Sequence, residues 1–233
     1  MTRVRRQFAA ALVVAVVASA LLSACASPAP TAMLRGAPFG AAVALPSPDT
    51  SGALPLESAL QQRRSAREFA STPLPVAVIG QLLWAAQGVT DAAGRRTAPS
   101  AGGRYPLELY VVTARETLHY LPDKHRVESR PDADMRGALM SAALDQPAVG
   151  SAPAVIVIAS VTKRTAAKYG AQARDFIEIE VGHAAQNILL QATALRLSAV
   201  PIGGFNAREI RTALALPPDE DVRYLIPVGY PSR

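Results

Sequence analysis

A short arginine-rich run carries the residue types that bind phosphate. The sequence reads Arg63-Arg64-Ser65-Ala66-Arg67, which places three guanidinium groups and a hydroxyl within five residues. Guanidinium groups present forked donors that match phosphate oxygens two at a time, and they keep their charge at any working pH. Taken alone, such a run is more often a solvated basic face than a binding site. Its interpretation therefore depends on what the rest of the chain places beside it.

A glycine-rich segment follows about thirty residues later, with the sequence Pro99-Ser100-Ala101-Gly102-Gly103-Arg104-Tyr105-Pro106. Glycines at such a turn let the flat surface of another molecule approach the backbone closely. The two segments together predict a site for a phosphorylated, planar cofactor.

Other enzyme chemistries have little support in the sequence. No serine lies in a Gly-x-Ser-x-Gly elbow, no glycine-rich loop ends in Lys-Ser or Lys-Thr, and Cys25 is the single cysteine. His119 and His125 lack metal-ligand spacing, so we expect no bound metal. Glu178 and Glu180 stand two apart on an expected helix and do not face each other, which argues against a paired-carboxylate site.

The charge of the chain argues against nucleic acid as a partner. The formal net charge is +6, and Arg3, Arg5 and Arg6 near the N-terminus supply three of those charges. The remainder therefore carries about +3, and aromatic residues make up only 5% of the chain. No basic stripe is interleaved with stacking rings, as a nucleic-acid-binding surface would require.

The spacing of apolar residues predicts an α+β domain with a small central sheet. The long helix expected over 173–197 has a wide apolar surface rich in alanine, which suits either the domain core or a dimer seam. We expect helices over Leu56–Arg63, Val76–Gln87, Ala133–Leu144, Ala173–Leu197 and Ala207–Leu214, strands over Leu107–Thr113, Ala154–Ser160 and Arg223–Val228, and a hairpin of Leu118–Leu121 with Arg126–Ser129.

The N-terminal segment has the form of an export signal. Residues 1–24 contain no acidic residue and combine a basic start with an apolar stretch. They lead into Leu22-Ser23-Ala24-Cys25, which resembles the lipobox of bacterial lipoproteins, where the cysteine is lipidated. We therefore expect a signal peptide over 1–24, a lipidated Cys25, an Ala- and Pro-rich tether over 25–49 and one folded domain over 50–233.

This organisation predicts a membrane-anchored lipoprotein of the cell envelope, on the periplasmic side in a Gram-negative cell. Two alternatives stay open at this point. The apolar stretch could be an uncleaved anchor, although at about seventeen residues it is short for the ~20 of a spanning helix. Arg5-Arg6 could belong to a twin-arginine export signal, although Val4 precedes them instead of Ser or Thr.

Six motifs follow one another in the order found in the nitroreductase superfamily. They are most similar to its branch of SagB-type dehydrogenases, which includes the thiazoline and oxazoline oxidases, and they extend over essentially the whole expected domain. The motifs are Arg-Arg-Ser-Ala-Arg-Glu-Phe at 63–69, Leu-Leu-Trp-Ala-Ala-Gln-Gly at 82–88, Arg-Thr-Ala-Pro-Ser-Ala-Gly-Gly at 96–103, Gly-His-Ala-Ala-Gln-Asn at 182–187, Pro-Ile-Gly-Gly-Phe at 201–205 and Val-Gly-Tyr at 228–230.

The resemblance implies an FMN-dependent oxidoreductase with a nitroreductase-like three-layer α/β/α fold around a small central mixed sheet. It implies an intertwined homodimer with two flavins at the subunit interface. It further implies ping-pong hydride transfer through flavin N5, from a donor such as NAD(P)H or a quinol to a small-molecule acceptor.

The resemblance also assigns roles to individual positions. Arg63 and Ser65 match the residues that hold the FMN phosphate, and we expect Arg64 between them to be part of the cofactor-binding run. Arg67 matches the residue that faces the N1/O2 edge of the flavin ring. Tyr105 is a candidate proton donor only because it lies in the loop that is expected to reach the flavin of the partner subunit. The catalytic residue therefore stays unknown. Two further groups complete the expected site: Pro99, Ser100, Ala101 and Gly102, which reach the flavin from the partner subunit, and Pro201, Ile202, Gly203 and Gly204, which run beside the ring with the Gly203 amide near N5.

The chain departs from the family pattern in two places. Many relatives carry one or two basic residues well after the last strand, whereas here only Arg233 could add to the phosphate site. Relatives that oxidise azolines act within peptide-modifying complexes, and no segment here resembles a peptide-docking domain. Two other functions stay open: a SagB-like dehydrogenase acting on a heterocycle in a peptide or small metabolite, and a flavin- or ligand-binding lipoprotein without catalysis.

Overall fold

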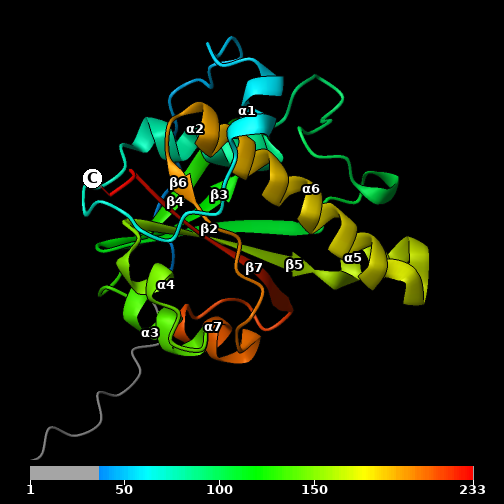
Figure 1. The fold of residues 1–233 in the computed structure, drawn as a ribbon. Coiled ribbons are helices and arrows are strands. Elements are labelled where there is room, and N and C mark those ends of the chain that lie inside the picture. Colours follow the sequence, from blue (N-terminus) through cyan, green and yellow to red (C-terminus); the bar gives the residue numbers. More distant parts are fainter. Residues whose placement is uncertain (1–36, 233) are drawn as a thin grey trace, which may run out of the picture. The chain divides into compact units, whose positions relative to one another are not determined.

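A seven-stranded sheet forms the middle layer of the domain (Figure 1). The structure is a computed structural model that describes residues 37–232. The expected signal peptide, Cys25 and Arg233 lie outside the described residues. From edge to edge the strands are β1 (Val43–Ala44), β4 (Arg126–Pro131), β3 (Glu116–Leu121), β2 (Leu107–Thr113), β5 (Ala154–Val161), β7 (Glu220–Gly229) and β6 (Ser198–Ala199).

Helices cover both faces of this sheet, which gives the expected three-layer α/β/α arrangement (Figure 1). One face carries α1 (Leu56–Gln62), α2 (Val76–Gln87), α5 (Thr162–Tyr169) and α6 (Ala173–Ala194). The other face carries α3 (Arg136–Ala142), α4 (Pro147–Ser151) and α7 (Ala207–Ala213). The α+β class is confirmed.

The central strand β5 sends alternate side chains into two separate cores. Ile156 and Ile158 pack in the core that also contains residues of α2 and α6. Val155 and Val157 pack in the core that contains residues of α3, α4 and α7. Successive side chains of a strand point to opposite faces, so a strand between two helical layers must be apolar at every position.

The sheet is antiparallel along all its named strands and not mixed as expected. Within residues 37–232 the only parallel pairing is an isolated bridge between Ser65 and Ala199. Continuous apolar strands such as β2 and β5 are typical of parallel sheets because those sheets are buried on both faces. Here helices bury both faces of an antiparallel sheet, so the apolar pattern reports burial and not strand direction.

The folded domain begins earlier than the sequence indicated. The expected tether extended to Asp49, but Val43–Ala44 pairs with β4, and Leu45 is only 7% exposed. The Asp49 amide also donates to Oε1 of Gln81 over 2.8 Å. The last part of the Ala- and Pro-rich stretch is therefore an edge of the domain.

Three helical elements also differ from the sequence prediction. The helix expected over 133–144 is shortened to α3, and Leu144 and Asp145 after it adopt positive φ angles of 57° and 55°. The short helix α4 then begins at Pro147, beyond the expected range, and was not expected. Helix α5 was not expected. None of the helices within residues 37–232 is long and apolar enough to cross a membrane.

Candidate functional site

The arginine-rich run lies where α1 ends and the chain meets β6. Ser65 forms the isolated bridge with Ala199, and the Ala66 amide donates to the Ala199 carbonyl over 3.0 Å. Nη1 of Arg64 donates to the carbonyl oxygens of Gln61 and Arg63, both at 2.8 Å. Arg64 thus satisfies carbonyls at the end of α1, which the helix leaves without partners. Although it was expected among the cofactor-binding residues, it does not line the cavity described next.

A cavity of about 500 Å³ opens beside this run. Its size lies within the range usual for small-molecule and cofactor sites. It brings together parts of the sequence that are more than a hundred residues apart: Arg63, Ser65, Gly182, Ala185, Gln186, Leu189, Pro201 and Tyr224. Three of the six sequence motifs, at 63–69, 182–187 and 201–205, therefore converge on one cavity.

Several hydrogen-bond donors in the motifs that meet at the cavity have no partner in the described part of the chain. Within residues 37–232, the side chains of Arg63 and Arg67 take part in no hydrogen bond or ion pair. The Gly203 and Gly204 amides donate to no described residue, while Ile202 beside them is fixed by backbone hydrogen bonds of 2.8 and 3.1 Å with Leu225. The Arg63 guanidinium and the Ser65 hydroxyl line the cavity, and the two glycine amides follow Pro201, which lines it, in the sequence. Donors of these kinds fit a phosphorylated, planar ligand. Arg67 is exposed and does not line the cavity.

The Pro99–Gly102 segment ends in a tight turn whose conformation favours glycine. Gly102 has a φ angle of 59°, and a Cβ there would lie 2.7 Å from the Tyr169 hydroxyl and 2.9 Å from Nζ of Lys168. Both side chains belong to α5, which packs directly against the turn. Glycine adopts this φ angle without strain, whereas a Cβ at this position would also force the ends of these two side chains to move.

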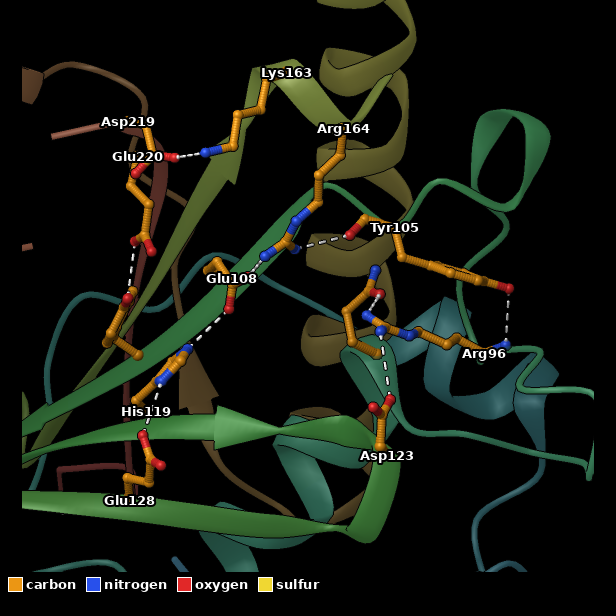
Figure 2. A network of polar contacts seen from close by, with 12 residues as sticks. Arg96, Tyr105, Glu108, His119, Asp123, Glu128, Lys163, Arg164, Asp219 and Glu220 are labelled. Atoms are coloured by element: carbon orange, nitrogen blue, oxygen red, sulfur yellow. Dashed lines mark hydrogen bonds and ion pairs between the residues drawn. The ribbon is translucent and has the colours of Figure 1, made fainter. Parts of the chain in front are cut away.

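Tyr105 supports the same loop from within. Its amide donates to Oγ of Ser100 over 2.8 Å, and its hydroxyl accepts a hydrogen bond from the Arg96 amide over 3.3 Å. The guanidinium of Arg96 also lies 4.4 Å from the centre of the Tyr105 ring (Figure 2). Tyr105 thus braces the loop and does not line the cavity beside Arg63.

A single chain does not bring Pro99–Gly102 to that cavity. The loop lies on the flank of α6 where Asn187 donates to the Thr97 carbonyl over 3.4 Å. The cavity is lined by Gly182, Ala185, Gln186 and Leu189 of the same helix. At 3.6 residues per turn, these two sets of residues lie on opposite flanks of α6. The two halves of the expected site are therefore separated by the helix within one chain.

One buried acid beneath the loop was missed by the sequence interpretation. Glu180 of α6 is 2% exposed, and burial raises the pKa of its carboxyl to about 7. Ser100, Arg96 and Gln87 act in the opposite direction and lower this pKa. The sequence did hold a signal, since Glu180 follows Ile177 by three and precedes Ala184 by four, which places an acid on the apolar stripe of a helix.

A second polar network lies on the sheet, away from the cavity (Figure 2). Nε2 of His119 lies 2.8 Å from Glu108 and Nδ1 lies 3.6 Å from Glu128. Burial lowers the pKa of His119, but the hydrogen bond and charge of Glu108 outweigh it and raise the pKa above the ordinary value. Glu108 also pairs with Arg164. Within residues 37–232 no group of three or more His, Cys, Asp or Glu side chains is placed to hold a metal ion.

Comparison with known proteins gives one consistent result. Residues 60–230 match the model of the nitroreductase family. The chain is 41% identical over 180 residues to "Putative nitroreductase MJ1384" of Methanocaldococcus jannaschii. This alignment covers 75% of this chain and 90% of that protein.

Solved structures agree with this sequence match. A crystal structure described as a putative nitroreductase from Ralstonia eutropha JMP134 superposes with a TM-score of 0.75 at 32% identity, covering 85% of this chain and 95% of that one. A structure from Desulfovibrio desulfuricans, described as a putative nitroreductase in complex with FMN, shares the fold with a TM-score of 0.58 at 23% identity, covering 77% of this chain and 88% of that one. The family match covers most of the described residues and contains the run at 63–67, the loop at 96–105 and the glycines at 203–204, so this chain belongs to the nitroreductase family.

Proposed function

We propose that the chain binds FMN in the cavity beside Arg63 and Ser65 and works there as an FMN-dependent oxidoreductase. The observation that carries the proposal is the convergence of three family motifs on one cavity of about 500 Å³ with unused donors. A guanidinium and a hydroxyl fit a phosphate, and two free glycine amides fit the edge of a planar ring.

Each of these residues is proposed to contact a different part of FMN. Arg63 and Ser65 would hold the phosphate, Arg67 would supply a positive charge for the redox edge of the ring, and the Gly203 amide would border the ring. FMN, when bound, supplies the redox chemistry by accepting two electrons from a donor and passing them to an acceptor in a ping-pong sequence. The protein binds and orients the partners and stabilises the negative charge that develops near Arg67.

The active form is proposed to be a homodimer, in which a second copy supplies Pro99–Gly102. The separation of the two half-sites by α6 supports this, because only another chain can bring the loop to the cavity. The outer face of α6 also suits close approach, since Ile179 is 56% exposed and the Cα of Gly182 faces open space. Light scattering of the purified domain tests this state: a monomer that holds FMN would contradict it.

The reaction partners are proposed from the class of the enzyme. The donor is NAD(P)H or a quinol, and the acceptor is a small molecule that stacks on the ring. The order of the six motifs favours the SagB-type branch, for which a heterocycle of the azoline class is the alternative substrate. Oxidation of an azoline without appreciable quinone reduction would favour that alternative, whereas bleaching of the flavin by NADPH and recovery with a nitroaromatic or quinone would favour a reductase.

The location of the protein is also a proposal. Met1–Ala24 would direct export, and a lipid on Cys25 would anchor the domain to a membrane through the residues before Phe39. Metabolic labelling with a fatty acid tests this, with Cys25→Ser as the control that should lose the label and leave the membrane fraction.

The arginine run gives the sharpest test of the cofactor site. The double variant Arg63→Ala/Ser65→Ala should lose FMN, because it removes the phosphate donors that line the cavity. Arg64→Ala should retain FMN, because the Arg64 guanidinium is bound to carbonyls at the end of α1. Retention of FMN by the double variant at wild-type occupancy would refute the proposed site. Bound FMN that no donor reduces would refute catalysis while leaving the site in place.

A further inference from the structure

A leucine is exposed at the corner between α3 and α4. Leu144 is 72% exposed, the largest exposed fraction among the large apolar side chains that lie in solvent within residues 37–232. It follows α3 directly, and α4 begins shortly afterwards at Pro147. Single exposed apolar side chains are common on protein surfaces, so exposure alone indicates no role. The backbone and the neighbours of Leu144 distinguish it from the others.

The backbone at this corner is strained. Leu144 and Asp145 have φ angles of 57° and 55°, in the left-handed region that residues with a side chain seldom enter. Aspartate enters this region more readily than most residues, whereas leucine does not. The corner is nevertheless held in place, because the Asp145 amide donates to the Met140 carbonyl over 3.0 Å. Glycine would fit position 144 without strain, so the course of the backbone does not explain the leucine.

The same corner is fastened to the glycine pair Gly203-Gly204. Nε2 of Gln146 donates to the Gly204 carbonyl over 3.0 Å, and the Asn206 amide donates to the Ala142 carbonyl over 2.8 Å. A Cβ on Gly204 would lie 3.8 Å from Cδ1 of Leu144, which is ordinary van der Waals contact. The exposed leucine therefore lies beside Gly204, although the two are far apart in the sequence.

The glycine pair connects this corner to the proposed cofactor site. A Cβ on Gly203 would lie 3.6 Å from Cε2 of Tyr224, and Tyr224 lines the cavity together with Arg63. Gly203 therefore lies next to a residue of the cavity, and Gly204 lies next to Leu144. With the phosphate held by Arg63 and the ring bordered by the glycine pair, Leu144 lies beyond the pair, beside the proposed place of the redox edge of the ring.

We propose that Leu144 is a specificity-determining residue, which forms an apolar wall for the planar ring of an acceptor that stacks on the flavin. The inference rests on the proposed function, because it assumes that Gly203 and Gly204 border FMN. An apolar aromatic acceptor gains free energy by covering an exposed leucine, whereas a small charged acceptor gains nothing from it. The strained backbone is retained because it presents this side chain at the site, and strain of this kind clusters at functional sites.

Two glycine substitutions at the corner separate the side chain from the strain. Leu144→Gly removes the apolar side chain and relieves the left-handed backbone, whereas Asp145→Gly relieves the neighbouring residue and keeps the leucine. Asp145 is a suitable match, because it is exposed and its side chain makes no hydrogen bond or ion pair within residues 37–232. Leu144→Met keeps an apolar side chain and serves as the conservative variant.

The first readout is the reoxidation of the FMN-loaded protein after chemical reduction with dithionite, so that no physiological donor is needed. Menadione serves as an apolar quinone, and ferricyanide serves as a small anion without an aromatic ring. In Leu144→Gly, the ratio of the reoxidation rate constant with menadione to that with ferricyanide should fall about fivefold, the loss expected when the ligand covers a leucine only in part. Asp145→Gly and Leu144→Met should keep the wild-type ratio.

Two further readouts do not depend on turnover. Quinoline is a planar, apolar ring that the flavin does not reduce, and its dissociation constant follows from the change in flavin absorption at pH 8. Leu144→Gly should weaken quinoline binding about fivefold, and Asp145→Gly should not. The melting temperature of the flavin-free protein should rise by roughly 1–4 °C in Leu144→Gly, because the strain is relieved and an exposed side chain packs little.

Other results would overturn the proposal. These are an unchanged acceptor ratio or quinoline dissociation constant in Leu144→Gly, or the same changes in Asp145→Gly. A melting temperature that does not rise, or loss of FMN from Leu144→Gly, would make Leu144 a packing residue. Dissociation of this variant into monomers in light scattering would assign Leu144 to the contact between copies. If the wild type binds no FMN, the proposed function fails and this inference with it; if the wild type binds FMN and the glycine variants behave alike, only the role of Leu144 fails.

Discussion

The substitution Glu180→Gln should change the pH dependence of stability in a direction fixed by the burial of this side chain. The carboxyl is 2% exposed, and its pKa rises from the ordinary 4.5 to about 7. The folded state therefore binds a proton that the unfolded state releases in this interval. The stability that this proton contributes is fully present below pH 4.5 and is lost as the pH rises to about 7.

The size of the effect follows from the same two values. The interval between 4.5 and about 7 corresponds to roughly 3 kcal/mol of unfolding free energy. Glutamine does not titrate. As the pH rises from 4.5 to 8, the unfolding free energy of the variant should therefore increase by about this amount relative to that of the wild type. For a domain of this size that is a gain of roughly 6–12 °C in melting temperature relative to the wild type.

Denaturation of the two proteins at a series of pH values measures this difference directly. The protein concentration must be held constant, because association contributes to apparent stability. Other titrating groups, such as His119, cancel in the comparison, and Asp175→Asn controls for a change of charge on the same helix. A stability difference that stays constant between pH 4.5 and pH 8 would refute the reasoning, because it would mean that Glu180 titrates normally.

Three further outcomes follow from the structure. Arg67→Ala should keep some FMN but lose turnover, whereas Arg63→Ala with Ser65→Ala should lose FMN itself. Absorption spectra measure the bound FMN, and NADPH oxidation rates measure turnover. Equal losses of FMN and of turnover in the two variants would contradict the division of roles. Gly102→Ala should lower the unfolding free energy by about 1–3 kcal/mol in urea titrations, because the residue has a φ of 59° and its Cβ would lie 2.7 Å from a hydroxyl of α5; an unchanged midpoint would show that the turn relaxes. His119→Gln should destabilise the protein most below pH 6.5, because Glu108 raises the pKa of His119. The difference in stability from the wild type should shrink as the pH rises through that raised pKa. Melting curves that show the same difference at pH 5.5 and pH 8.5 would contradict this ion pair.

The sequence predicted the elements with strong periodicity and missed those decided by tertiary contacts. The helix at Val76–Gln87 and the strand at Leu107–Thr113 have the predicted bounds, because their apolar patterns are unambiguous. The direction of the strands was wrong in part, because burial on both faces gives the same pattern in either direction. Residues 43–49 were also assigned to the tether instead of the folded domain. A two-residue edge strand is too short to show an alternation of apolar and polar residues.

The candidate site was predicted in composition but not in geometry. Residue types pointed to Arg63 and Ser65, and the structure places both on one cavity. Nothing in the spacing of the run could show that Arg64 is bound at the end of α1, or that α6 separates the cavity from Pro99–Gly102. Glu180 was considered only as part of a pair with Glu178, whereas its importance lies in its position on the buried side of the helix.

The absorption spectrum of the purified chain tests the central claim most directly. We expect flavin bands from the wild type at an equimolar amount of FMN, and their loss in the Arg63→Ala/Ser65→Ala variant under the same conditions. A wild-type protein that stays colourless after incubation with FMN, or a double variant with the spectrum of the wild type, would contradict the proposed cofactor site.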